Sequence, residues 1–232
     1  MKNKEKAALY FEYLEKYAFG DLELFHKLAA DAEAKERDLS SSTTSEGTRY
    51  HGGSYGAEPY PDFVEERRPL EVVSRATIPF ALMMFSCMDV LGYLVRSGDG
   101  ADNENAHTKT AKNIFVFFKF VNASPTELEI DCLVNIYRHG LGHNYFPKLG
   151  YSISYHSHNS KDKLFFLDAV GMRAILNVNR LEYYFRSGFE GIKSSENLYG
   201  QISERLEKMN LFYQRKDEQK MLEVIRQLYT SV

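Results

Sequence analysis

The 232-residue sequence contains no Trp, only two Cys, six Pro and 15 Gly, and its formal net charge is −3. So few Pro and Gly exclude collagen and a disordered chain rich in these residues. Two Cys are too few for the disulfide framework of a small secreted domain. The nearly balanced charge excludes a globally basic protein, so contact with nucleic acid requires a local basic patch. With 44% hydrophobic residues, the chain is expected to be globular.

No export signal is visible in the sequence. The first residues, MKNKEKAALYFEYLEK, lack the continuous apolar stretch that follows the basic start of a secretory signal. Cys87 and Cys132 lie within apolar runs, as buried thiols in a reducing compartment do. We therefore expect a cytoplasmic protein.

One segment is about long enough to span a bilayer, namely Ala76 to Val95, ATIPFALMMFSCMDVLGYLV. Asp89 lies well inside it, and an unpaired carboxylate at that depth costs about 3 kcal/mol on insertion scales. Thr77, Pro79 and Ser86 dilute the segment further. The sequence therefore favours a central buried helix over a membrane span.

Apolar residues recur at helical spacing over much of the chain. The expected helices of the first part are Lys2–Arg37, with a break near Gly20, Pro69–Arg96, Thr108–Val121 and Pro125–Asn144. A segment rich in Ser, Thr, Gly and Pro at about residues 38–68 is expected to be a long loop. Four such helices indicate a bundle over residues 1–150.

After residue 150 the pattern changes. The segments YSISYHSH and KLFFLDAV are short and suit strands, and the turn-prone Asn159 to Asp162 separates them, which predicts a small β-hairpin. From about Met172 the helical pattern returns, so residues 151–232 should form a hairpin and C-terminal helices packed on the core. The predicted fold class is all-α, an up-and-down helical bundle with this small hairpin.

The segment from Tyr137 to Lys148, YRHGLGHNYFPK, departs most from local rules. Gly140 and Gly142 each cost a helix about 1 kcal/mol relative to Ala, which is typical of a position kept for function or for a helix end. Arg138 offers a permanent forked charge for a phosphate, and His143 titrates near neutral pH. Such a pair suits cleavage of a phosphodiester, which needs a proton carrier and stabilisation of an anionic transition state.

This motif resembles the signature of the HEPN superfamily, in which an Arg, a polar residue and a His lie near the end of a late helix in a bundle. Here the match is Arg138, His139 and His143, and the following Asn144 and Tyr145 extend it to the Arg-x4-His-x-Tyr form of one toxin branch. The likeness covers roughly Met1 to Lys148. Members of this superfamily are often metal-independent endoribonucleases of toxin-antitoxin or antiphage systems.

The resemblance implies a homodimer whose shared cleft cuts RNA without a metal or another cofactor. By this resemblance His143 acts as base or acid, Arg138 holds the phosphate, and His139 or Asn144 orients them. Asp89 has two interpretations that remain open here. Its helix exposes it to solvent, or it forms an ion pair with Arg138 or His143.

The surroundings of the motif are locally basic, since residues 135–163 contain four Lys or Arg, Lys148 among them, and one acidic residue. In the toxin branch, the residue matching Tyr145 can be modified by a partner nucleotidyltransferase, which implies such an antitoxin. A non-catalytic module that binds RNA, nucleotide or protein is the alternative. A metal site built from His139, His143, His156 and His158 is less favoured, because its members come from segments not known to meet.

Overall fold

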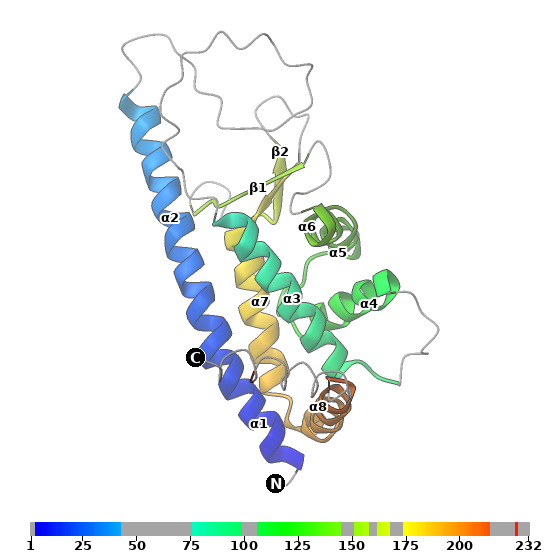
Figure 1. Ribbon diagram of the computed structural model, residues 1–232. Coiled ribbons are helices and arrows are strands. Elements are labelled where there is room, and N and C mark those ends of the chain that lie inside the picture. The colour runs from blue at the N-terminus through cyan, green and yellow to red at the C-terminus, as the bar shows by residue number, and fades with distance from the viewer. Residues whose placement is uncertain are drawn as a thin grey trace.

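The computed structural model describes residues 3–42, 76–98, 106–144, 151–157, 162–167, 174–213 and 226, and most of these are helical. A small three-stranded sheet lies at one end of the helices (Figure 1). The helical character of the chain was therefore predicted correctly. The expected loop at about 38–68 is described only as far as Ser42, and up to that residue it is helical, which corrects its start.

The chain begins with one long helix that runs through α1 (Asn3–Tyr13), η1 (Leu14–Ala18) and α2 (Phe19–Ser42). The middle part, η1, is a π-helix, and such a segment accommodates one extra residue without ending the helix. The expected break near Gly20 is thus a π-helical segment that ends just before it. Ion pairs from Lys6 to Glu207 and from Glu15 to Lys193 tie this helix to the C-terminal helices.

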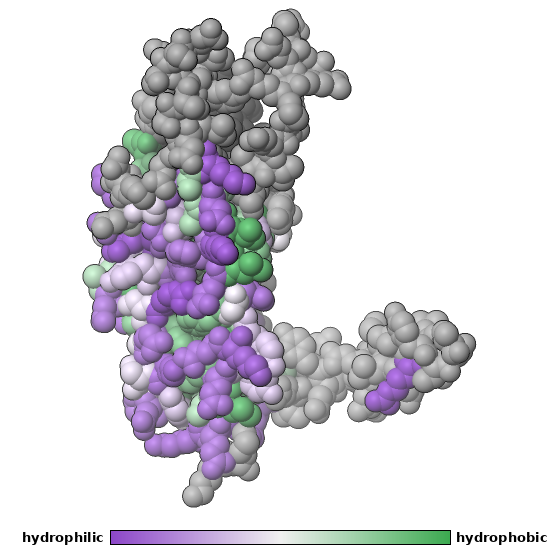
Figure 2. All heavy atoms as spheres, turned by 90° about the vertical axis from the view of Figure 1, so that its left-hand side faces the viewer, coloured by the Kyte–Doolittle hydropathy of each residue, from purple (hydrophilic) through white to green (hydrophobic). Residues whose placement is uncertain are grey.

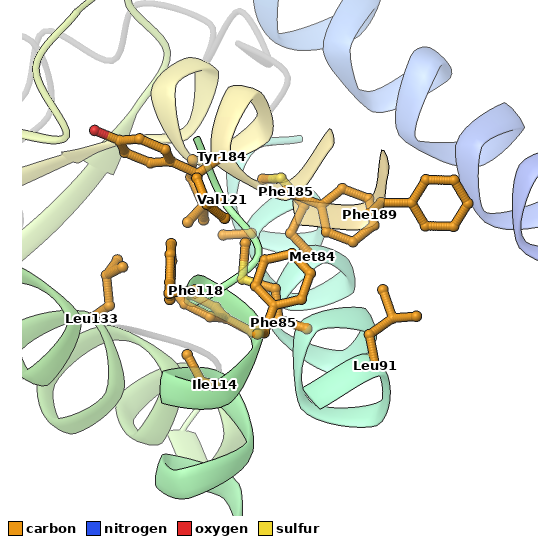
Figure 3. Packing of buried hydrophobic residues seen from close by; sticks show 14 of the residues in the cluster. Met84, Phe85, Leu91, Ile114, Phe118, Val121, Leu133, Tyr184, Phe185 and Phe189 are labelled. Carbon is orange, nitrogen blue, oxygen red and sulfur yellow. The ribbon is translucent and has the colours of Figure 1, made fainter. Parts of the chain in front are cut away.

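Helix α3 (Thr77–Val95) is the central helix of the protein, with α2 on one side and α4 on the other (Figure 1). By length and composition alone it is apolar enough to cross a membrane, and no other helix in the described part of the chain is. Ten of its residues are buried within the protein, however. Figure 3 shows side chains of α3, α4 and α7 meeting there, among them Met84, Phe85, Ile114, Phe118, Phe185 and Phe189. The segment is a core helix in this structure, as predicted.

Helix α4 (Ala106–Phe118) crosses α3 very closely at Gly92. A Cβ atom at Gly92 would lie 1.8 Å from the carbonyl oxygen of Asn113, so only glycine permits this approach. After α4, Ala123 adopts a left-handed backbone conformation with φ 54°, which ends the helical path. The chain then enters α5 through a capping box of Thr126 and Glu129, the start that the sequence predicted.

A second long helix follows, made of α5 (Glu127–Cys132), η2 (Leu133–Arg138) and α6 (His139–Asn144). It confirms the expected helix up to Asn144. As in the first long helix, the middle segment is a π-helix. Arg138 is the last residue of that segment, and the glycines of the motif lie in α6.

The sheet contains β1 (Tyr151–Ser154), β2 (Phe165–Leu167) and β3 (Ala174–Asn177) in the order β1-β3-β2. The predicted hairpin was wrong, because β1 and β2 do not pair with each other. Instead β3 lies between them, parallel to β1 and antiparallel to β2. The prediction missed β3 since its apolar sequence, AILN, leads directly into a helix.

Helix α7 (Val178–Lys193) starts at Asn177, whose side chain accepts a hydrogen bond from the backbone N–H of Asn179. This N-cap explains why the helix does not start near Met172, as expected. A short 3-10 helix, η3 (Glu196–Leu198), connects it to α8 (Tyr199–Tyr213). Residues of α7 and α8 belong to the same buried cluster as those of α1, α3 and α4, so one core extends across residue 150.

Candidate functional site

Asp89 of α3 and Arg138 of η2 meet in a polar cluster at the edge of the core. Arg138 Nη2 lies 3.5 Å from Asp89 Oδ2 and donates a hydrogen bond to Thr110 Oγ1 at 3.3 Å. The two charged side chains are 27% and 23% exposed, so solvent reaches both. The ion pair that was one of two interpretations of Asp89 is therefore present, and Arg138 is its partner.

Two residues of α4 complete this cluster, and the sequence analysis did not single them out. Thr110 Oγ1 donates to Asp89 Oδ2 at 3.0 Å, and Asn113 Nδ2 donates to Asp89 Oδ1 at 2.7 Å. Both residues are buried although they are polar, and they lie three positions apart on a largely apolar helix. That spacing was the only signal of their role.

The close crossing at Gly92 explains why these groups meet. Gly92 and Asp89 are three residues apart, so they share one face of α3. The glycine brings the backbone of α4 against that face, and Asn113 contacts both positions. Asp89 is thus held between two helices, and it can orient Arg138 from a fixed place.

The sheet fixes the helix that carries Arg138. Tyr137, the preceding residue, is fully buried, stacks on Phe165 of β2 and packs edge-on against Tyr151 of β1. Its hydroxyl donates to the carbonyl oxygen of Ala174 in β3 at 2.9 Å. Burial raises the pKa of Tyr137 far above its ordinary value, so this donor keeps its proton. Each strand therefore contacts the residue next to Arg138.

The outer side of Arg138 is left open by a glycine. Gly142 is exposed, and a Cβ atom built there would lie 3.9 Å from Arg138 Nη1, with no other heavy atom within 4 Å. Among the described residues, only Nη2 of this guanidinium has partners. The other N–H donors of this guanidinium are available to an anion. The planar guanidinium of Arg can donate two parallel hydrogen bonds to a carboxylate or phosphate.

The other predicted site residues are described only in part. His139 is half-buried at the start of α6. His143 and Asn144 belong to the end of α6, but their side chains lie outside the described part, as do Tyr145 and Lys148 entirely. In a regular α-helix, five residues separate two side chains by about 140° around the axis, so Arg138 and His143 diverge. The geometry of the proposed catalytic pair therefore remains a prediction.

No group of three or more His, Cys, Asp or Glu side chains suited to a metal occurs within the described ranges. His156 packs edge-on against Phe166, and burial lowers its pKa.

Cys87 and Cys132 are free thiols, and burial raises the pKa of Cys87 to about 11. Both thiols are only half-buried, whereas the sequence predicted buried ones. Burial also raises the pKa of Cys132, so neither thiol is an activated nucleophile.

A second polar group connects α2 with α7. His26 Nδ1 lies 2.6 Å from Glu182 Oε2, its Nε2 lies 3.1 Å from the hydroxyl of Tyr155, and Arg186 donates to Glu182 Oε1 at 2.8 Å. Burial and nearby carboxylates raise the pKa of Tyr155 to about 12. The open depression beside them, about 510 Å³, is lined by Glu23, His26, Asn179, Glu182, Tyr183 and Arg186. Because both ring nitrogens of His26 are used within the protein, this group serves to pack α2 on α7.

No protein-family model matches this chain, and neither the curated proteins nor the solved structures contain a match. The likeness to the HEPN superfamily therefore rests on the motif around Arg138 alone. Function has to be argued from the chemistry of this site.

Proposed function

We propose that the protein is a metal-independent endoribonuclease of the HEPN type. In this proposal the 2′-hydroxyl of RNA attacks the adjacent phosphorus while a base removes its proton. The 5′-oxygen of the next nucleotide leaves with a proton from an acid, so the products carry a 2′,3′-cyclic phosphate and a 5′-hydroxyl. His143 carries one of these protons, and the guanidinium of Arg138 stabilises the phosphate charge.

The observation that carries the proposal is the arrangement of Arg138. Its Nη2 is anchored by Asp89 and Thr110 from two other helices, and its Nη1 lies beside the exposed Gly142. An anchored, half-exposed Arg is prepared to bind an anion without reorganisation, which is what transition-state stabilisation requires. An Arg used only for packing would not need an open side next to Gly142.

The proposal includes a homodimer, because Arg138 and His143 diverge on one helix and a second copy would bring its own motif to the cleft. Gly142 is the exposed small residue available for this approach. Gly140, the other glycine of the motif, is buried within the protomer. A toxin of a toxin-antitoxin or antiphage system is the biological role we propose, with His139 and Asn144 as orienting residues and Lys148 as an RNA contact.

The proposed antitoxin is a nucleotidyltransferase that modifies Tyr145. A nucleotide attached there would place negative charge beside Arg138 and repel RNA. Peptide masses from cells expressing both proteins test this step. An unmodified Tyr145 in cells with a demonstrably active transferase would remove the regulatory role.

The second candidate is a non-catalytic module that binds RNA, nucleotide or protein at Arg138. The divergence of about 140° between Arg138 and His143 favours it, because an anion at the guanidinium would not touch the imidazole of the same helix. Such a module needs only the anchored Arg. RNA binding without cleavage would select it over the enzyme.

Incubation of the purified protein with bulk RNA, with and without EDTA, tests the proposal. We expect cleavage that survives chelation and leaves 2′,3′-cyclic phosphate ends. Activity that EDTA abolishes and zinc restores would contradict it and favour the histidine metal site. Binding with no cleavage in either condition would leave the binding module.

A further inference from the structure

A row of exposed side chains runs along the outer face of the long N-terminal helix. Five large hydrophobic residues there are between 37% and 56% exposed, which is unusual for one face of one helix. Together with one glycine they form what we name the N-terminal stripe: Leu9, Tyr13, Tyr17, Gly20, Leu24 and Leu28. The rings of Tyr13 and Tyr17 stack on each other, with centroids 5.6 Å apart.

The π-helical segment η1 keeps the two ends of this stripe in line. Leu28 follows Leu9 by 19 residues, whereas five turns of an α-helix take about 18. The extra residue accommodated by η1 accounts for the difference. The stripe is thus a seam of five turns, roughly 28 Å long at about 1.5 Å per residue.

The stripe faces away from the Arg138 site. In Figure 1 the long N-terminal helix lies along the left edge, and α4, α5 and α6 lie to the right, with α3 and α7 between them. Figure 2 views that left-hand side and shows hydrophobic side chains among a majority of hydrophilic ones. Contact at the stripe would leave the Arg138 site open.

The spacing of the stripe residues is symmetric about its centre, between positions 18 and 19. The residues whose numbers sum to 37 are Leu9 with Leu28, Tyr13 with Leu24, and Tyr17 with Gly20, the last a large residue with a small one. In an antiparallel pair of identical helices, such residues lie opposite each other. We propose that the stripe binds a second copy of this chain, helix against helix, in an antiparallel two-fold contact.

Two details of the stripe support this occupant. No heavy atom lies within 4 Å of a Cβ built at Gly20, so the ring of Tyr17 from the second copy has room to lie there. Lys16 and Asp21, both exposed and without an ion-pair partner among the described residues, also have numbers that sum to 37. Opposite charges therefore face each other twice across the two-fold axis.

A parallel pairing would not have this complementarity. It would set Lys16 beside Lys16 and Asp21 beside Asp21, and like charges in contact destabilise an interface. It would also stack Tyr17 on Tyr17 and leave the gap at Gly20 unfilled. The antiparallel arrangement satisfies both the charges and the shapes.

This self-association goes beyond the proposed function and does not depend on it. If the cleft dimer also forms, each copy uses two different two-fold contacts, which join dimers into a tetramer or a larger assembly, and loss of the stripe contact leaves a dimer. If the cleft dimer does not form, the corresponding species are a dimer and a monomer. In both cases, loss of the stripe contact lowers the mass to that of the smaller species.

Sedimentation of the full chain at tens of micromolar tests the proposal through a charge exchange. Lys16→Asp should weaken association, because the new Asp faces Asp21 of the second copy, and Asp21→Lys should weaken it similarly. The double variant Lys16→Asp/Asp21→Lys should recover the mass of the unaltered protein. Recovery is specific to an antiparallel contact, since neither folding nor net hydrophobicity would produce it.

A hydrophobic substitution provides the matched control. Leu24→Glu should lower the mass to that of the smaller species, whereas Leu167→Glu, at a residue that is 63% exposed on β2, should leave it unchanged. Circular dichroism checks that each variant is folded. A monomeric unaltered protein at these concentrations would overturn the proposal, as would single charge variants that keep its full mass.

Discussion

Two helices of this protein, residues 3–42 and 127–144, have the same irregularity, and it has a different role in each. Each contains a π-helical segment, η1 in the first and η2 in the second. In the first helix, the extra residue aligns exposed residues such as Tyr17 on an outer face. In the second helix, the segment ends at Arg138, which turns inward to Asp89. One extra residue thus aligns an exposed surface in the first helix, whereas in the second helix it lies in the segment that ends at the candidate site.

The difference follows from what each segment packs against. Tyr151 and Phe165 of the sheet pack against the ring of Tyr137, and the carbonyl oxygen of Ala174 accepts a hydrogen bond from its hydroxyl, so the sheet holds the backbone before Arg138 in place. The η1 segment contains no buried residue and is tied to α7 by the ion pair of Glu15 and Lys193. We expect the second π-segment to be the more strongly determined by packing.

Adding one more residue to each π-helical segment is the strongest way to break this comparison. Insertion of an Ala after Lys16 exceeds the one extra residue that η1 accommodates and should rotate α1 by about 100° relative to α2. The rotation would take Phe11 out of the core, and losing a buried Phe costs about 3 to 5 kcal/mol of unfolding free energy. Urea denaturation measures the loss. Unchanged stability would mean that η1 has no role in placing α1.

The corresponding insertion in the second helix should act on the site. An Ala inserted after Asn135, which is exposed in η2, should turn Arg138 away from Asp89 and abolish RNA cleavage. Cleavage per folded molecule should survive the insertion after Lys16. Equal loss of cleavage in both insertions would contradict the division of roles.

Truncation of the anchored Arg should have the next largest effect. Arg138→Ala should lower the cleavage rate by about 10² to 10³-fold, as removing one donor to a transition-state anion does. Arg138→Lys should recover only part of the activity, because Lys lacks the fork that holds a phosphate in a plane. Single-turnover cleavage measures both, and Arg180→Ala on α7 is the control. Full activity in Arg138→Ala would remove this residue from the chemistry.

Gly92→Ala should destabilise the fold and the site together. Its Cβ would lie 1.8 Å from the carbonyl oxygen of Asn113, and overpacking of this kind costs about 1 to 3 kcal/mol. Gly200→Ala is the matched control, because no heavy atom lies within 4 Å of its Cβ. Thermal denaturation should show a loss for the first variant only. Similar stability of both would mean that the two helices separate easily.

Asp89→Asn should have a smaller effect than loss of Arg138. The variant keeps a hydrogen-bonding side chain between Thr110 and Asn113 but loses the charge that holds Arg138. We expect a decrease in cleavage of about tenfold, near the 1.5 kcal/mol typical of a hydrogen bond to a charged group. Rate measurements across salt concentrations test it. Unchanged cleavage would assign Asp89 to packing alone.

The smallest predicted effect concerns pH. Burial lowers the pKa of His156 below its ordinary value of 6.5, so the unfolded chain binds a proton more readily than the folded one. Stability conferred by neutral His156 is therefore present above about pH 6.5 and is lost as the pH falls below it. His156→Phe should flatten this part of the stability profile in urea titrations. An identical slope would show that other groups cause the pH dependence.

The helices were predictable because their signals are local. The spacing of apolar residues predicted the long helices to within a few residues at the ends that the structure describes. Both π-segments were missed, since one extra residue per helix shifts the apolar pattern too little to be noticed. The sheet was mispredicted because β3 pairs in parallel with β1, and such pairing depends on a segment 20 or more residues away.

For the candidate site, the sequence predicted which residue types take part but not which residues they contact. The sequence left open whether Asp89 faces solvent or pairs with Arg138 or His143, and the structure shows the pair with Arg138. Thr110 and Asn113 were not singled out, because polar residues that face solvent on a helix can have the same spacing. The side chain of His143, which the proposed chemistry needs most, lies outside the described residues.

The central claim is that anchored Arg138 and His143 cut RNA without a metal. The most direct measurement is the end chemistry of RNA incubated in EDTA with the unaltered protein, Arg138→Ala and His143→Ala, each checked for helical circular dichroism. The account predicts 2′,3′-cyclic phosphate ends from the unaltered protein alone. Cleavage by either folded variant at the unaltered rate, or none by the unaltered protein, would contradict it.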